Sequence, residues 1–153
     1  MSSSIVATVN REDQPPLAST FSALSIVPIP PHKPAVHLLH TAGQVGLPSP
    51  SSPSAALPTS FREQAENAFA NVAACLALGG ATPRDITKIT IYVVDYELSM
   101  RAVLAEVITA FFSTGGSEKP HAPPSTLLGV AALASKEFLI EVDAEAVVVA
   151  RPE

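Results

Sequence analysis

The sequence predicts a single α+β domain over residues 1–153, in which two helices pack on one face of a mixed β-sheet. Strand and helix patterns follow one another in the order ββαβαββ, and each helical segment carries one apolar stripe. With 47% hydrophobic and only 15% charged residues, the chain has a large core but few charges for its surface. Because no third helix is predicted for the other sheet face, we expect a partner subunit to cover it.

Two strands are predicted before the first helix. Residues 21–27 alternate apolar and small polar side chains, and residues 35–44 form a largely apolar run that ends at a glycine turn. Ten of the 15 prolines fall among the first 60 residues, which predicts loops over 28–34 and 47–60. The second loop is rich in serine and is expected to be a mobile surface connection. Residues 1–18 are expected to form a flexible N-terminus.

The first helix is predicted from Ser60 to the glycine pair Gly79-Gly80. Ser60 and Glu63 have the spacing of a capping box, in which each side chain binds a backbone N–H of the first turn. A glycine at the end supplies the positive φ that many helix ends need. Between them, apolar residues recur three and four positions apart and predict one buried stripe: Phe61, Ala65, Ala68, Phe69, Val72 and Leu76.

The second half of the chain predicts a strand, a helix and two further strands. Residues 88–94 are rich in β-branched side chains and are typical of a buried central strand. Residues 98–112 form the second amphipathic helix, followed by strand candidates at 125–133 and 138–149.

The last predicted strand carries three acids on one face. Glu141, Asp143 and Glu145 alternate with apolar residues, so they share a side of the strand. Asp143 and Glu145 are equally compatible with an ordinary solvated face. Glu141 lies nearest the strand's start, where a cleft can open. A half-buried carboxylate there would have a raised pKa and could hold a water molecule or move a proton.

Charge and composition disfavour several classes of function. The formal net charge is −5, and no lysine or arginine cluster is present, so nucleic-acid binding and basic membrane-surface helices are disfavoured. No segment has the pattern of a signal peptide or the length of a membrane span. Cys75 is the only cysteine and is expected to be a small buried hydrophobe. We therefore expect a soluble cytoplasmic protein.

Standard catalytic motifs are absent from the sequence. There is no glycine-rich phosphate loop and no Gly-x-Ser-x-Gly elbow. His37 and His40 lie three apart on a predicted strand, so they point to opposite faces and make a poor metal pair. We expect no metal site.

Four stretches, in this order, resemble the reactive intermediate deaminase family, also called Rid or YjgF. They span about residues 21–149, and their order and spacing carry the resemblance: Thr41–Gly46 with its Gly-Gln turn, Gln64–Ala74 leading to Gly79-Gly80-Ala81, Asp85–Asp95, and Pro123–Val130 with Ile140–Ala146.

The resemblance implies a chorismate-mutase-like fold and a homotrimer, with the sheets facing inward as a barrel and the helices outside. It also implies small-molecule ligands in clefts between neighbouring subunits. Members of the deaminase type hydrolyse reactive enamines and imines, made from amino acids, to 2-keto acids and ammonia. They need no metal or organic cofactor.

The family's site residues carry over only in part. The glutamate of the last strand is retained as Glu141. Ser125 stands where the resemblance expects the arginine that binds the substrate carboxylate, and Leu127 stands in place of a cysteine. The family's tyrosine, serine and asparagine are matched by Phe21, Ala42 and Ala105.

These replacements make the expected cleft more apolar and remove its cation. Serine cannot supply the bidentate charged grip of arginine, so binding of free 2-imino acids should be weak. Arg101 is a conceivable replacement cation. The hydroxyls of Ser125 and Thr126 could hold a carbonyl oxygen, while Glu141 would act as general acid or base.

Three functions remain open at this point. The first is an enzyme that hydrolyses an imine or enamine, or carries out a related proton transfer, cyclisation or dehydration in a biosynthetic pathway. The second is a trimer that holds a metabolite or protein partner without catalysis. The third, an endoribonuclease or translation inhibitor, is disfavoured by the charge.

Overall fold

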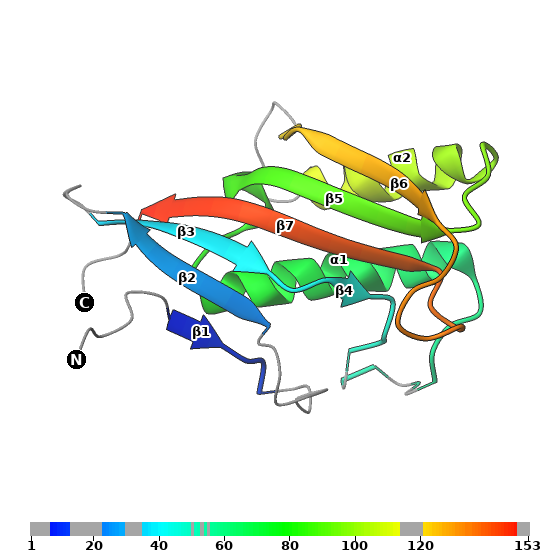
Figure 1. The fold of residues 1–153 in the computed structure, drawn as a ribbon, viewed down its shortest axis with the longest axis horizontal. Coiled ribbons are helices and arrows are strands. Elements are labelled where there is room, and N and C mark those ends of the chain that lie inside the picture. Colours follow the sequence, from blue (N-terminus) through cyan, green and yellow to red (C-terminus); the bar gives the residue numbers. More distant parts are fainter. Residues whose placement is uncertain are drawn as a thin grey trace.

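The computed structural model describes residues 7–12, 23–29, 35–49, 51–52, 54, 56–113 and 121–149. Two α-helices lie behind a seven-stranded sheet in the view of Figure 1. The helices are α1 (Phe61–Leu78) and α2 (Met100–Phe112), and a short 3-10 turn, η1, covers Pro83–Asp85. The strands are β1 (Ala7–Val9), β2 (Leu24–Ile29), β3 (Val36–Thr41), β4 (Gln44–Val45), β5 (Ile86–Val94), β6 (Ser125–Val130) and β7 (Ile140–Val149).

The sheet is mixed, as predicted. Its order is β1-β2-β3-β7-β5-β6, and β4 also pairs with β7. Among the strand pairs of the described residues, only β5–β6 is parallel. The predicted α+β class, with two helices on one sheet face, is confirmed. One element was not predicted: residues 7–9, inside the segment expected to be flexible, pair with β2 as an edge strand.

Helix α1 begins and ends at the predicted residues. The Ser60 hydroxyl accepts a hydrogen bond from the Glu63 backbone N–H, which is the first half of the predicted capping box. After Leu78 the chain turns through Gly80 at a φ of 75°, and the Ala81 N–H donates to Leu76 O. The predicted stripe is buried under the sheet, except that Phe61 is only half-buried at the helix start.

Helix α2 starts two residues later than predicted and packs on α1 and the sheet through Leu104, Val107 and Phe112. Phe111 is half-buried and stacks at a tilt on Phe69 of α1. Residues 115–116, a glycine pair just after this helix, lie outside the described residues. Within the described part of the chain, neither α1 nor α2 combines the length and hydropathy that a membrane-spanning helix requires.

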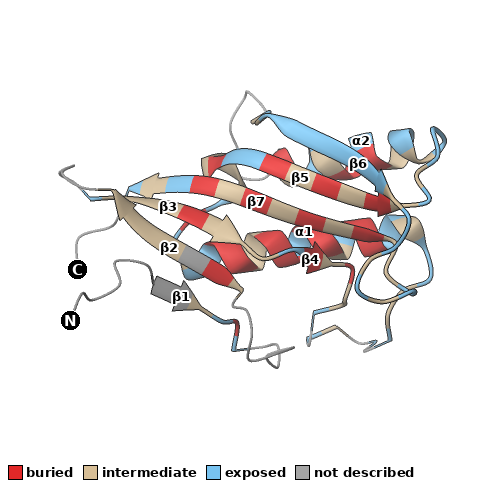
Figure 2. Ribbon diagram, in the orientation of Figure 1, coloured by how far each residue is buried: buried red, intermediate tan, exposed pale blue. Residues whose placement is uncertain are grey.

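Strand β7 is buried on one face and open on the other. Its residues alternate as predicted: Ile140, Val142, Ala144 and Ala146 are buried against the helices. The other face carries the acids, and we call this side of the sheet the open face. In Figure 2 buried and half-buried residues alternate along β7 and β5. Among the described residues, no helix packs on the open face.

Strands β3 and β4 replace the single strand predicted over residues 35–44. His40 pairs with Glu145 and Gln44 with Val142, both across to β7. Three residues separate His40 from Gln44, but only two separate their partners, so one extra residue bulges from the ladder. The bulge brings Gly43 up to β7 beside Glu141.

Buried amides of α1 hold the segments on either side of this bulge and at the start of β7. The Gln64 amide nitrogen donates to Pro58 O and Glu137 O, and its oxygen accepts from the Leu139 N–H. Two turns further on, Asn71 donates to Val45 O and Leu47 O. These contacts tie the first residues of β7 and the β4 segment to one helix.

Candidate functional site

Glu141 lies on the open face between two neighbouring strands. In register it pairs with Val45 of β4 on one side and Tyr92 of β5 on the other. The side chain is half-buried, and this burial raises the pKa of the Glu141 carboxyl above its ordinary value of 4.5. The negative charge of Asp143, two residues along the same face, raises that pKa further. The arrangement predicted from the alternation of β7 is therefore present, with a carboxyl that takes up a proton more readily than usual.

Gly43 makes room for the Glu141 carboxylate. A Cβ added to Gly43 would overlap Glu141 Oε1 and would lie 2.6 Å from Cδ and 2.9 Å from Cγ. Real Cβ atoms do not approach so closely, so only glycine fits while the carboxylate keeps this place. Gln44 stiffens the turn, because its side-chain amide donates to the carbonyl oxygens of Ala42 and Gly43.

We expect Gly43→Ala to displace the Glu141 carboxylate and leave the fold intact. The clashing group is the end of a flexible side chain, so the cost in stability should be about 1 kcal/mol or less. The displaced carboxyl becomes better hydrated, and its pKa should fall toward 4.5. A carbon-detected NMR titration of Glu141, with a thermal unfolding curve as control, measures both effects. An unchanged Glu141 pKa in a folded variant would contradict the role given to Gly43.

Tyr92 and Asp143 complete the immediate surroundings of Glu141 and were not assigned to the site from the sequence. In register, Tyr92 lies opposite Glu141 and Thr90 opposite Asp143, so all four side chains share the open face. Burial raises the pKa of the Tyr92 hydroxyl, and the negative charges of Asp143 and Glu141 raise it further. The alternation of residues 88–94 puts Thr90 and Tyr92 on one face, and this was the available signal. Which residues of the neighbouring strand they lie opposite depends on the pairing register, which the sequence alone does not show.

One predicted lining residue, Thr126, lies on the same side as Glu141, and another, Ala42, is adjacent to Gly43. Ala42 immediately precedes Gly43, and its N–H donates to Ala23 O at 2.8 Å. Thr126 pairs in register with Thr90, so it shares the open face with Asp143. The sequence did not point to Leu128, which pairs with Tyr92 and is 42% exposed beside it.

Three other predicted lining residues, Ser125, Leu127 and Ala105, do not meet Glu141 within one chain. Ser125 and Leu127 pair with the buried residues Ile89 and Ile91, so they lie on the helix side of β6. Ser125 lines a pocket of about 260 Å³ with His121 and Phe112. Ala105 is exposed on α2, as is Arg101, so neither lies on the open face. Phe21 lies outside the described residues.

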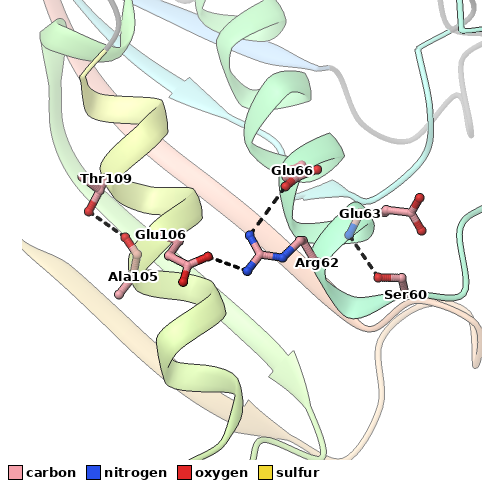
Figure 3. A network of polar contacts seen from close by, with 7 residues as sticks. All are labelled: Ser60, Arg62, Glu63, Glu66, Ala105, Glu106 and Thr109. Carbon is pink, nitrogen blue, oxygen red and sulfur yellow. Dashed lines mark hydrogen bonds and ion pairs between the residues drawn. The ribbon is translucent and has the colours of Figure 1, made fainter.

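A larger groove, of about 540 Å³, lies between α1 and α2 on the helix layer. Figure 3 shows Arg62 reaching across it from α1 to Glu106 of α2, with Glu66 one turn further along α1. Arg62 and Glu106 form an exposed ion pair, which water screens. The groove is on the side of the sheet opposite Glu141, so its charges belong to helix packing rather than to this site.

Metal ligands are not gathered in the described part of the chain. No three His, Cys, Asp or Glu residues there are arranged to hold an ion. Cys75 is fully buried in α1, as expected from its apolar neighbours. The chemistry available around Glu141 on the open face is that of two carboxylates and a phenol.

Comparison with solved structures places this architecture among known proteins. Escherichia coli YjgF superposes with a TM-score of 0.70 at 24% identity, covering 92% of this chain and 98% of that one. RidA from an Antarctic Psychrobacter gives 0.67 at 25% identity, covering 93% and 99%. Escherichia coli TdcF, solved with bound serine, gives 0.71 at 22% identity, covering 93% and 98%. No curated protein matched the chain.

The family comparison covers the same part of the sequence as the motifs. Residues 23–148 match the family described as Endoribonuclease L-PSP, and this span includes both helices, strands β2 to β6 and all of β7 but its last residue. YjgF and RidA structures are among those that share the fold. The chain therefore belongs to the Endoribonuclease L-PSP family, the YjgF/Rid family that its motifs resemble.

Proposed function

We propose that this protein is a homotrimer that acts on a small organic molecule in clefts between subunits, with Glu141 as the general acid and base. The proposed reaction is hydrolysis of an imine or enamine, or a related cyclisation or dehydration in a biosynthetic pathway. The family and fold support a small-molecule-binding or deaminase-like function. The observation that carries the proposal is the half-buried Glu141 carboxyl with its raised pKa, held against Gly43.

The chemistry of imine hydrolysis suits such a group. Water attacks the carbon of the protonated imine, and the Glu141 carboxylate takes a proton from the water as the C–O bond forms, which leaves a neutral carbinolamine. The protonated carboxyl then returns this proton to nitrogen. As the C–N bond breaks, the carboxylate takes the remaining hydroxyl proton, which leaves a carbonyl compound and an amine or ammonia. A carboxyl whose pKa is raised serves both steps, because base and acid forms are both accessible closer to neutral pH.

Two features support a second copy of the chain at this site. The open face carries large apolar side chains that stay exposed in one chain: Leu128 at 42%, Val147 at 37% and Val149 at 53%. Predicted lining residues lie on the opposite side of the sheet, where only another subunit could bring them to a Glu141 side chain. Light scattering tests this directly, and a mass other than that of three chains would overturn the trimer.

Charge argues against RNA as the substrate, although the family is described as Endoribonuclease L-PSP. The net charge of −5 and the acids on the open face would repel a phosphate backbone. Non-catalytic binding is the alternative that the missing arginine favours, because Ser125 cannot grip a substrate carboxylate by charge.

Turnover of imines made in situ separates an enzyme from a binding protein. An amino-acid oxidase and an amine oxidase would each supply imines, and semicarbazide would trap what the protein leaves unhydrolysed. Wild type should suppress trapping, and Glu141→Ala should not suppress it. Glu145→Ala removes a carboxylate four residues further along β7 on the same face and should behave as wild type. No suppression with any small or aromatic imine would reject the deaminase proposal in favour of binding.

A further inference from the structure

Tyr92 is a neighbour of Glu141 to which the resemblance assigns no role in the site. The resemblance expects a tyrosine near residue 21, where this chain has phenylalanine. A phenol is instead supplied by Tyr92, directly opposite Glu141 in the β5–β7 ladder. Such directly opposed residues have Cβ atoms about 4.5 to 5.5 Å apart. The aromatic ring and the Glu141 carboxylate therefore border the same space on the open face.

Asp143 lies diagonally across from Tyr92 on the same face of the sheet. Its charge and side-chain hydrogen bonding raise the pKa of the Tyr92 hydroxyl, and hydrogen bonding from Thr90 lowers that pKa. Because the pKa of Tyr92 is raised by burial and by the neighbouring acids, the phenol keeps that proton at neutral pH. A phenol that shares its proton with a neighbouring carboxylate presents its oxygen to a ligand as a hydrogen-bond acceptor.

We call residues that pair side by side across neighbouring strands a row. The two rows around Glu141 and Tyr92 contain hydrogen-bond acceptors but no cation. One row runs Val45, Glu141, Tyr92 and Leu128, and the other runs Asp143, Thr90 and Thr126. Among the described residues the nearest lysine on this face is Lys88, and it pairs with Glu145 in the next row. Within the described part of the chain, a ligand at Glu141 therefore meets two carboxylates and a phenol oxygen, while Lys88 and His40 lie opposite Glu145.

We propose that Tyr92 is a specificity-determining residue of the Glu141 site, and that with Asp143 it selects substrates that have a positively charged nitrogen and no carboxylate. This inference rests on the proposed function and names the substrate class for it. A protonated imine donates its N–H to the carboxylate or phenol oxygens and can lie against the ring face. An imino acid would bring its own carboxylate toward Glu141 and Asp143, with no arginine to offset the repulsion.

The test compares two imines that differ only by the carboxylate. Phenethylamine with an amine oxidase and phenylalanine with an amino-acid oxidase supply them, and suppression of semicarbazide trapping gives kcat/KM for each. Wild type should prefer the imine from phenethylamine. Tyr92→Phe should reduce this preference about fivefold, and Asp143→Asn about tenfold, the effects of one neutral and one charged hydrogen bond.

Matched controls exist for both substitutions. Tyr96→Phe makes the same chemical change at the only other tyrosine, in the turn after β5. Glu145→Gln removes one charge from the same face, one row beyond Asp143. Neither control should change the ratio of the two substrates. An equal loss with Tyr96→Phe would show a structural effect and overturn the role of Tyr92.

A binding measurement keeps the inference testable without turnover. Phenethylamine and 3-phenylpropionate carry opposite charges on similar frames, and NMR titration of wild type gives the affinity of each. Tighter binding of phenethylamine, weakened by Tyr92→Phe, supports the inference even if no imine is hydrolysed, which would reject only the proposed reaction. Preference for the imino acid, or tighter binding of 3-phenylpropionate, would overturn the inference and leave the proposed function standing.

Discussion

Glu141→Gln should lower kcat/KM for the imine substrate by about a hundredfold to ten-thousandfold, the usual contribution of a general acid–base group. The amide has nearly the same shape and keeps its place against Gly43, but it cannot take or return a proton. Glu145→Gln removes a carboxylate from the same face and should cost little. If the Glu141→Gln variant kept more than a tenth of wild-type activity, Glu141 would be a binding residue and not the acid–base group.

The same substitution should stabilise the fold at higher pH. The Glu141 pKa is raised in the folded protein, mainly by burial and then by Asp143, so the folded state binds this proton more tightly than the unfolded state. Its contribution to stability is therefore complete below the ordinary pKa of 4.5 and is lost as pH rises through the raised value. Glutamine does not titrate, so it escapes this loss.

Thermal unfolding of both proteins between about pH 4 and pH 8 measures the effect. The melting temperature of the variant should exceed that of wild type at the upper end, and the gap should close toward the lower end. A group retained at a cost in stability is typical of functional sites. A constant gap across this range would mean that Glu141 does not titrate with a raised pKa in the folded protein.

The elements and Glu141 itself could be predicted because they depend on local patterns. The period of α1, its Ser60 start and its glycine end all lie within one stretch of sequence. The alternation of β7 separates Ile140, Val142, Ala144 and Ala146 from the acids without any knowledge of neighbours. Strand β1 escaped prediction because three residues are too few to show a pattern of their own and are placed by pairing with β2.

The surroundings of Glu141 could not be predicted because they depend on long-range register. A one-residue shift in pairing would place Tyr92 opposite a different residue and turn its neighbours to the other face. The bulge before Gln44 shifts the pairing register by one residue, and the glycine is the only feature of the sequence that indicates it. Likewise, Ser125 and Thr126 are adjacent in sequence but lie on opposite sides of β6.

Gln64→Leu should destabilise the protein by about 3 kcal/mol, which lowers the melting temperature by roughly 6 to 12 °C. Gln64 is 1% exposed and makes three hydrogen bonds of 2.8 to 2.9 Å, to Pro58 O, Glu137 O and the Leu139 N–H. Leucine fills the same space but leaves these backbone groups without their partner. An unpaired buried group costs about 1 to 3 kcal/mol, and relaxation prevents the full sum.

Asn67→Leu is the matched control on the same helix. Asn67 is half-buried and donates a hydrogen bond to Gly46 O at 3.1 Å, so its loss should cost about 1 kcal/mol. Because Leu139 directly precedes β7, Gln64→Leu should also speed amide exchange at Leu139 and loosen Glu141 two residues on, which lowers turnover in the folded protein. If amide exchange at Leu139 rises no more than exchange at the buried β5 amides, the substitution acts on Leu139 only through global unfolding. That result would also remove Gln64 as the residue that positions Glu141.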